Sequence, residues 1–255
     1  MKILTAAFSD KGGRPNNEDS FVCAADMRGL NFRRDAVWAV ADGLGGMVGG
    51  ELASSFVTEY IKRHALLLDN FSGEALLQLM NSANQALLTE QERRQARRGM
   101  RTTVAAAFME KGVLTAIHFG DSRFYYFREN KLFYQSRDHS MSQVAVDLGE
   151  ITPADIRFHE DRSRVLKVLG NDEVLQTKAP IFKETVRPGD AFMLCTDGFW
   201  ELILEEEMTA CLRRSLPVRT PVLEAPQIWL DGMLGVLRPR LKPCSDNYTA
   251  VCCMA

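Results

Sequence analysis

Apolar residues occur along the chain in two patterns, short continuous runs and helical repeats. Short runs bounded by turn-forming residues are typical of buried strands, and apolar residues at three- and four-residue steps are typical of amphipathic helices. The first part of the chain is therefore predicted to form strands at residues 3–9, 20–26 and 36–41, followed by helices at about 50–68 and about 73–96. In the second helix the repeat comprises Leu76, Leu77, Met80, Ala83, Leu87 and Leu88.

The middle of the chain favours antiparallel hairpins. Lys111-Gly112 and Glu129-Asn130 form short turns between strand candidates at Thr103–Met109, Val113–Phe119, Arg123–Phe127 and Leu132–Ser136. A polar segment follows, with helices predicted near Ser142–Leu148 and from Thr152-Pro153 onward. Further strands are expected at about 178–185, 190–196 and 248–254, and further helices at about 205–215 and 222–238.

This order of elements predicts layered, mainly antiparallel sheets with paired helices outside them. We expect residues 1–255 to form one domain, because no repeat, low-complexity tract or linker divides them. The polar segment at about 141–165 has the length of a functional flap. Its mixed charge suits either recognition of residues that flank a substrate site or an ordinary solvated insertion.

Composition and charge narrow the class of protein. With 46% hydrophobic and 25% charged residues the chain has the balance of a globular protein. A net charge of −2 gives no reason to expect nucleic acid or an anionic membrane as partner. The N-terminus lacks a signal-peptide pattern, and no run reaches the ~18 apolar residues of a membrane span. Six cysteines without a C-x-x-C spacing suggest reduced thiols in a cytoplasmic protein.

Aspartates stand at the ends of three predicted buried strands. Asp42-Gly43 and Asp197-Gly198 follow two of these strands, and Asp246-Asn247 precedes the last strand. Glycine after an aspartate allows a sharp turn and brings backbone oxygen close to whatever the carboxylate holds. Carboxylates gathered in this way are costly unless paired, and hard cations are their natural partners. The alternative for each aspartate alone is an ordinary turn residue.

Further acidic residues extend this metal hypothesis. Glu18-Asp19 and Asp121 also lie at predicted strand edges or turns. Together these carboxylates could hold two metal ions about 3.5–4 Å apart, with room for water. Because no histidine accompanies these motifs, Mg²⁺ or Mn²⁺ is favoured over zinc.

The motifs in their order resemble those of one family, the metal-dependent protein serine/threonine phosphatases of type 2C in their compact bacterial form. The resemblance covers essentially all 255 residues. It implies an α+β fold, a four-layer α-β-β-α sandwich of two mainly antiparallel sheets flanked by helices. The matching motifs are Arg14-x-x-Asn17-Glu18-Asp19, Asp42-Gly43-x-Gly45-Gly46, Thr102-Thr103, Gly120-Asp121-Ser122-Arg123, Asp138-His139-Ser140, Asp197-Gly198 and Asp246-Asn247.

The resemblance also implies roles for individual residues. Asp42 would bridge two metals, Asp197 and Asp246 would hold the first, and Glu18 with the carbonyl of Gly43 would hold the second. Asp121, with Asp197, would bind a third and weaker metal. Asp19 would orient metal-bound water, and Arg14 would grip the phosphate, for which its planar, permanently charged fork is suited. A surface turn is the alternative for Arg14.

Three positions near these motifs need separate comment. Leu44 stands where many eukaryotic members carry a histidine thought to protonate the leaving group, so a metal-bound water or no dedicated acid must serve. Arg101 stands where a glycine is usual; it could add affinity for phosphate or point to solvent, and we expect solvent. His139 could shuttle protons. We expect it instead to bond a neighbouring backbone group.

The predicted function is hydrolysis of phosphoserine and phosphothreonine in proteins by two Mn²⁺ or Mg²⁺ ions, in opposition to a serine/threonine kinase. The expected partners are phosphorylated proteins, and we expect a cytoplasmic monomer without membrane insertion or nucleic-acid binding. Two alternatives remain: a catalytically weak phosphoprotein-binding regulator of the same fold, and another two-metal phosphohydrolase such as a phosphodiesterase. The intact aspartates disfavour the regulator, and the Arg14 motif and the motif order disfavour the phosphodiesterase.

A narrower resemblance concerns one short stretch. Residues 195–201, Cys-Thr-Asp-Gly-Phe-Trp-Glu, resemble phosphatases associated with type VI secretion. In that case the targets would be a membrane-anchored kinase and a forkhead-associated scaffold.

Overall fold

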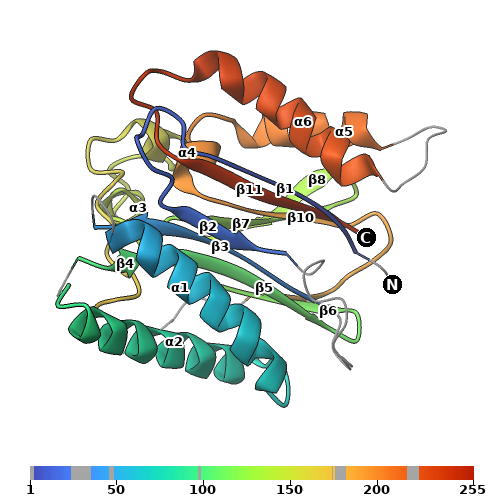
Figure 1. The fold of residues 1–255 in the computed structure, drawn as a ribbon. Coiled ribbons are helices and arrows are strands. Elements are labelled where there is room, and N and C mark those ends of the chain that lie inside the picture. The colour runs from blue at the N-terminus through green and yellow to red at the C-terminus, as the bar shows by residue number, and fades with distance from the viewer. Residues whose placement is uncertain are drawn as a thin grey trace.

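Two β-sheets pack face to face, and pairs of helices cover their outer faces (Figure 1). The computed structural model describes residues 3–23, 36–45, 49–96, 99–173, 175, 182–216 and 224–255. This arrangement confirms the predicted α-β-β-α sandwich and the α+β class. Some predicted positions lie outside the described residues, namely 24–26, 46, 178–181 and 222–223.

The first sheet joins the two ends of the chain. Its described strands run antiparallel in the order β1 (Leu4–Asp10), β11 (Tyr248–Met254), β10 (Ala191–Cys195), β7 (Arg123–Arg128) and β8 (Lys131–Gln135). The second sheet has the order β2 (Asp19–Val22), β3 (Ala36–Leu44), β5 (Val104–Glu110), β6 (Val113–Phe119) and β9 (Phe182–Thr185). A two-residue strand, β4 (Arg101–Thr102), pairs with the far end of β3.

Helices cover each sheet from outside (Figure 1). The second sheet is covered by α1 (Gly49–His64), which continues into a 3₁₀ turn η2 (Ala65–Leu67), and by α2 (Gly73–Arg93). The first sheet is covered by α5 (Glu205–Ser215) and α6 (Ala225–Leu237), which is followed by a 3₁₀ turn η5 (Arg238–Arg240). A single helical turn, α4 (Asp197–Trp200), follows β10 directly.

Three apolar cores lie between the four layers, and alternation along the strands divides side chains among them. On β10, Met193 and Cys195 face α5 and α6, whereas Phe192 and Leu194 face the other sheet. Successive side chains of a strand point to opposite faces, so a strand buried on both faces is continuously apolar. This accounts for the unbroken apolar runs of the sequence.

Both predicted hairpin turns are present. Lys111 and Gly112 have φ angles of 52° and 81°, and Glu129 and Asn130 have 52° and 58°. Positive φ at both central residues matches the right-handed twist of the flanking strands. These hairpins connect β5 to β6 and β7 to β8.

The predicted flap at 141–165 contains little regular structure. It contains α3 (Met141–Asp147) and a 3₁₀ helix η3 (Pro153–Phe158), which begins where the sequence predicts a second helix, at Thr152-Pro153. Ser140 caps α3 by accepting from Gln143 N at 3.2 Å. Ser140 and Val165 form an isolated bridge, so the two ends of the flap lie together. In the described part of the chain, no helix is both long and apolar enough to cross a membrane.

Candidate metal centre

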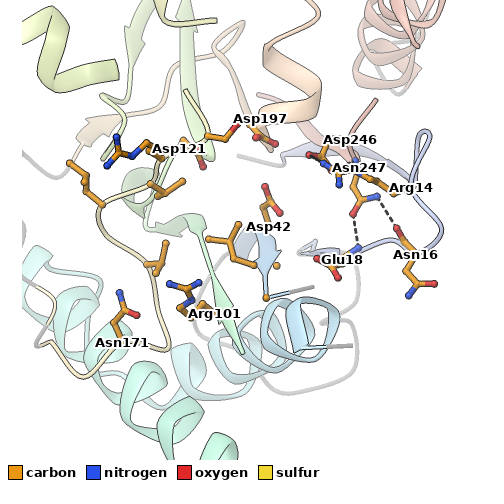
Figure 2. A pocket seen from close by; sticks show the side chains of 18 of the residues that line it. Arg14, Asn16, Glu18, Asp42, Arg101, Asp121, Asn171, Asp197, Asp246 and Asn247 are labelled. Carbon is orange, nitrogen blue, oxygen red and sulfur yellow. Dashed lines mark hydrogen bonds and ion pairs between the residues drawn. The ribbon is translucent and has the colours of Figure 1, made fainter. Parts of the chain in front are cut away.

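A cleft with a volume of about 970 Å³ lies where the predicted motifs meet (Figure 2). It brings together nearly all of the predicted site residues from five separate segments of the chain. Its lining includes Arg14, Glu18, Asp42, Gly43, Asp121, Asp197 and Asp246. Asp19, the remaining predicted residue, is not part of the lining.

Asp42 lies within a strand and not at a turn. β3 continues through Asp42-Gly43 to Leu44 because β4 supplies a new partner, with Gly43 opposite Thr102 and Leu44 opposite Arg101. The Thr102 hydroxyl donates to the Asp42 carbonyl at 2.7 Å, and Asp42 N donates to the Thr103 hydroxyl at 3.1 Å. The expected sharp turn after Asp42 is therefore wrong, and the backbone of this residue is held in place by Thr102-Thr103.

The glycines next to the aspartates permit close approach of neighbouring backbone. A Cβ on Gly43 would lie 2.1 Å from the Gly50 carbonyl oxygen, and one on Gly198 would lie 2.1 Å from that of Asn247. Gly198 belongs to α4, so a helical turn stands where a sharp turn was expected after Asp197. Its N–H donates to Asp197 Oδ1 at 2.6 Å. Both glycines are required by packing next to the carboxylates.

Asp19 lies opposite Asp42 in the β2–β3 pairing. Its Oδ2 accepts hydrogen bonds from the hydroxyls of Thr196 at 2.8 Å and Thr249 at 2.7 Å. Its Oδ1 is buried without a partner. The carboxylate is thus oriented from one side, and one oxygen remains unpaired.

Asp121 occupies the connection from β6 to β7, which crosses from one sheet to the other. The Trp200 indole N–H donates to the Asp121 carbonyl at 2.9 Å, and this bond links Asp121 to α4, where Asp197 is the first residue. Asp121 is only 3% exposed, and its Oδ1 has no partner.

The loop that carries Arg14 and Glu18 is held by Asn247. The amide oxygen of Asn247 accepts from Glu18 N at 2.7 Å, and its amide nitrogen donates to the carbonyls of Lys11 and Asn16, both at 2.9 Å. Arg14 donates to Asp246 Oδ2 at 2.6 Å, and its side chain is 53% exposed. Figure 2 shows Arg14, Asn16, Glu18, Asp246 and Asn247 together on one side of the cleft.

The carboxylates raise one another's pKa values. Burial, followed by the charges of Asp197, Asp19 and Asp121, raises the pKa of Asp42 well above its usual range. Burial and the charge of Asp121 do the same to the pKa of Asp197. Burial raises the pKa of Asp19 to about 7 despite its two hydroxyl donors, and burial with the charge of Asp138 raises that of Asp121 to about 7. The negative charges of these four aspartates are therefore not balanced by positive groups of the protein itself.

The donor set fits hard divalent cations. The side chains proposed as metal ligands are all carboxylates, which suit Mg²⁺ and Mn²⁺, and that of Asp121 has a buried, unpaired oxygen. Among the described residues, no three His, Cys, Asp or Glu side chains already converge as a group that could hold an ion. The carboxylates therefore line a common cleft without converging on one point.

Several residues that support the site were not predicted to do so. Thr196 and Thr249 orient Asp19, Asn247 holds the Arg14 loop, and Trp200 holds Asp121. Asn247 stood within a recognised motif, but its role depends on segments more than two hundred residues away. Trp200 stood within the 195–201 stretch without an assigned contact.

Three further expectations can be compared with the structure. Arg101 lines the cleft and its Nε is buried, so the expectation that it points to solvent is wrong. Leu44 also lines the cleft. His139 accepts from Gly120 N at 3.3 Å, and this backbone bond is the expected one; burial lowers the pKa of His139 to about 3.

Comparison with known proteins identifies the family. The sequence profile described as "Protein phosphatase 2C" matches residues 15–234. The serine/threonine protein phosphatase PstP of Mycobacterium tuberculosis is 34% identical over 218 residues, which is 84% of this chain and 39% of that protein. The chain thus spans well under half the length of that relative.

Solved structures show the same fold. The catalytic domain of PstP in complex with two manganese ions is 29% identical, with a TM-score of 0.75 over 99% of this chain and 97% of that one. PppA, a regulatory component of type VI secretion in Pseudomonas aeruginosa, is 24% identical, with a TM-score of 0.73 over 100% and 98% of the two chains. At that identity the likeness shows the fold alone. The profile match and the relatives together place this chain in the protein phosphatase 2C family.

Proposed function

We propose that this chain hydrolyses phosphoserine and phosphothreonine in proteins, with two Mn²⁺ or Mg²⁺ ions in the cleft. The observation that carries the proposal is the cleft itself. It gathers carboxylates that raise one another's pKa values, next to an arginine with a half-exposed guanidinium. A phosphomonoester brings negative charge, so a site made mostly of carboxylates can accept it only when cations are bound. Membership of the family and the manganese-bound PstP structure support this proposal.

The proposed metal ligands are Asp42 as bridge, Asp197 and Asp246 on one side, and Glu18 with the Gly43 carbonyl on the other. Asp121 with Asp197 is the proposed site of a third ion. Bound divalent ions would supply a water of lowered pKa and positive charge beside the phosphoryl oxygens. Asp19 would orient such a water, because its carboxylate is fixed by two threonine hydroxyls and retains an unpaired oxygen.

Arg14 is the proposed phosphate-binding residue. Its guanidinium reaches the rim of the carboxylate cluster, where it donates to Asp246. The side chain of Arg14 is half-exposed, which leaves further guanidinium N–H groups for phosphoryl oxygens. Phosphoryl oxygens accept two parallel hydrogen bonds from a guanidinium well. Leu44 lines the cleft where a proton donor would otherwise stand, so the leaving group takes its proton without a side chain at this position.

The predictions about domain extent, partners, oligomeric state and cellular location are also proposals. We propose one phosphatase domain over residues 1–255, supported by the pairing of β1 with β11 at opposite ends of the sequence. A kinase that opposes the enzyme, a forkhead-associated scaffold, a role in type VI secretion, a monomeric state and a cytoplasmic location all remain predictions. The fold shared with PppA does not separate this subgroup from the rest of the family.

The test compares substrates of different chemistry under the same conditions. A phosphothreonine peptide, p-nitrophenyl phosphate and a phosphodiester are each incubated with Mn²⁺ and with a chelator, and release of phosphate or alcohol is measured. We expect metal-dependent release from both monoesters and slower turnover of the diester. Preferred cleavage of the diester would replace the proposal with the phosphodiesterase alternative. Peptide binding without turnover under any divalent cation would favour the regulator.

A further inference from the structure

Arg101 occupies a defined position on the wall of the cleft. It pairs with Leu44 across β4 and β3, two residues beyond Asp42. Side chains of paired residues, and of residues two apart on a strand, point to the same face, so Arg101, Leu44 and Asp42 share the cleft face. Residues two apart on a strand, such as Asp42 and Leu44, are separated by about 7 Å along it. Figure 2 shows Arg101 and Asn171 on the side of the cleft away from Arg14, with Asp42 between the two arginines.

Among the residues that the structure describes, the buried Nε of Arg101 has no hydrogen-bond partner. This N–H group donates to no described acceptor, and none of the described carboxylates forms an ion pair with the guanidinium. Arg14, in contrast, is paired with Asp246. A buried charged donor without an acceptor is destabilising, and such groups in folded proteins call for an explanation.

The backbone around Arg101 is fixed on both sides. Thr102 and Leu169 exchange hydrogen bonds of 3.1 and 2.9 Å. The Gln91 amide donates to the carbonyls of Met100 at 2.6 Å and Gly170 at 2.8 Å. These bonds tie β4 to the segment that follows the flap. Arg101 is therefore presented to the cleft from a rigid support, which reduces the ordering cost of binding a ligand.

We propose that Arg101 binds a second anionic group of the substrate, a carboxylate or phosphoryl group on a residue near the phosphorylated one. The inference rests on the proposed function. Arg14, Glu18 and Asp246 lie on the other side of Asp42 (Figure 2), so the reacting phosphoryl group already has a cationic partner there. An extended peptide advances about 3.5 Å per residue, which allows side chains a few positions apart to reach both arginines. The same cleft is also lined by Leu166, Val168 and Asn171, which are uncharged, and by Arg164, which is paired with Asp161 at 3.1 Å.

The test measures how the substrate preference depends on Arg101. Substrates are p-nitrophenyl phosphate, a phosphothreonine peptide with neutral flanks, and peptides in which one glutamate or one phosphoserine moves through the flanking positions. Arg101→Met keeps an unbranched side chain and removes the charge. Arg101→Lys keeps the charge and removes the planar guanidinium group. Arg63→Met is the matched control, because Arg63 is 71% exposed on α1 and pairs only locally with Glu59.

We expect the wild type to prefer an anion at one or more flanking positions. Arg101→Met should raise KM for those peptides about tenfold or more, with kcat, the neutral peptide and p-nitrophenyl phosphate unchanged. The KM of Arg101→Lys for those peptides should lie between the values of the wild type and Arg101→Met. The KM of Arg63→Met should match that of the wild type. The glutamate and phosphoserine series distinguish a carboxylate from a phosphoryl ligand.

Two results would overturn this assignment while leaving the proposed function intact. One is a wild type without preference for flanking anions. The other is an equal loss on all substrates in both Arg101 variants, which would place Arg101 at the reacting phosphoryl group or in the support of the fold. If the wild type releases no phosphate from any substrate, the proposed function fails, and the inference fails with it.

Discussion

At the residue scale, side chains that bond only to backbone hold the cleft in shape. Asn247 joins the Arg14 loop to the start of β11 through three hydrogen bonds. Asn81 is a matched residue elsewhere: it donates to the carbonyls of Leu77 and Leu175 and accepts from Leu175 N. The two asparagines allow loss of stability to be separated from loss of site geometry.

Asn247→Leu should lower both stability and substrate affinity. Loss of its bonds should cost about 1–3 kcal/mol in the free energy of unfolding. KM for a phosphothreonine peptide should rise, because the loop that carries Arg14 and Glu18 loses its anchor. Asn81→Leu should cost a similar amount of stability at unchanged KM. Denaturant unfolding and steady-state kinetics measure both quantities, and equal KM values in the two variants would refute the positioning role of Asn247.

Arg14→Ala should weaken use of the phosphorylated substrate and spare metal binding. Loss of a charge-assisted contact to the phosphoryl group predicts a fall in kcat/KM of about tenfold to hundredfold. Mn²⁺ affinity, measured by calorimetry, should not weaken, since Arg14 competes for Asp246. Unchanged kinetics in this variant would refute its proposed role.

At the element scale, the single turn α4 connects the metal centre to the core. Its Trp200 ring lies 3.4 Å from the Arg123 guanidinium carbon, and Arg123 is paired with Asp138 through bonds of 2.8 and 2.7 Å. The same indole donates to the Asp121 carbonyl. α4 thus places Asp197 and Asp121 relative to each other through one buried ring.

Trp200→Phe should alter metal dependence because it removes the bond to Asp121 and keeps an aromatic ring. Trp229→Phe is the control, since Trp229 of α6 donates in the same way to the carbonyl of Met208 in α5 at 3.0 Å. We expect each variant to lose about 1–3 kcal/mol of stability. Only Trp200→Phe should need a higher Mn²⁺ concentration for half-maximal activity. A shift of the same size in Trp229→Phe would contradict the proposed link.

Local periodicity was sufficient to predict most elements, and pairing over long distances decided the rest. The helices α1 and α2 and both hairpins follow from residues close in sequence. The extension of β3 through Asp42-Gly43 does not, because its partner β4 lies almost sixty residues further on. α4 is too short to show a helical repeat.

The candidate site was predictable as a set of residues but not as a geometry. The motif order indicated which carboxylates belong together, and all but Asp19 line the cleft. The contact between Trp200 and Asp121, the bonds of Asn247 and the direction of Arg101 depend on tertiary packing. No local pattern encodes these contacts.

At the scale of the whole molecule, the uncompensated carboxylates couple stability to pH and to metal. Folding raises the pKa values of Asp19 and Asp121 to about 7, well above that of an aspartate in an unfolded chain. In the metal-free protein, their contribution to stability is therefore present at low pH and is lost as pH rises through about 7. Cations that bind the ionised carboxylates offset this loss.

The increase in Tm caused by Mn²⁺ should therefore be larger at about pH 8 than at about pH 5. Thermal unfolding with Mn²⁺ and with a chelator across this range measures the difference. The neutral His139, whose pKa is lowered to about 3, contributes stability that is lost as pH falls. This contribution does not depend on the metal, so it cancels in the difference. A metal-induced shift that is constant or declines with pH would contradict the coupling.

The most direct test of the central claim is phosphate release from a phosphothreonine peptide by the wild type and by Asp42→Asn. Asparagine keeps the size of the side chain and removes the charge that is proposed to bridge two ions. We expect release by the wild type to require Mn²⁺ or Mg²⁺ and to stop on chelation, and Asp42→Asn to lose about a thousandfold in kcat. Release that persists in the chelated wild type, or in Asp42→Asn at a rate near that of the wild type, would contradict a metal-dependent phosphatase centred on Asp42.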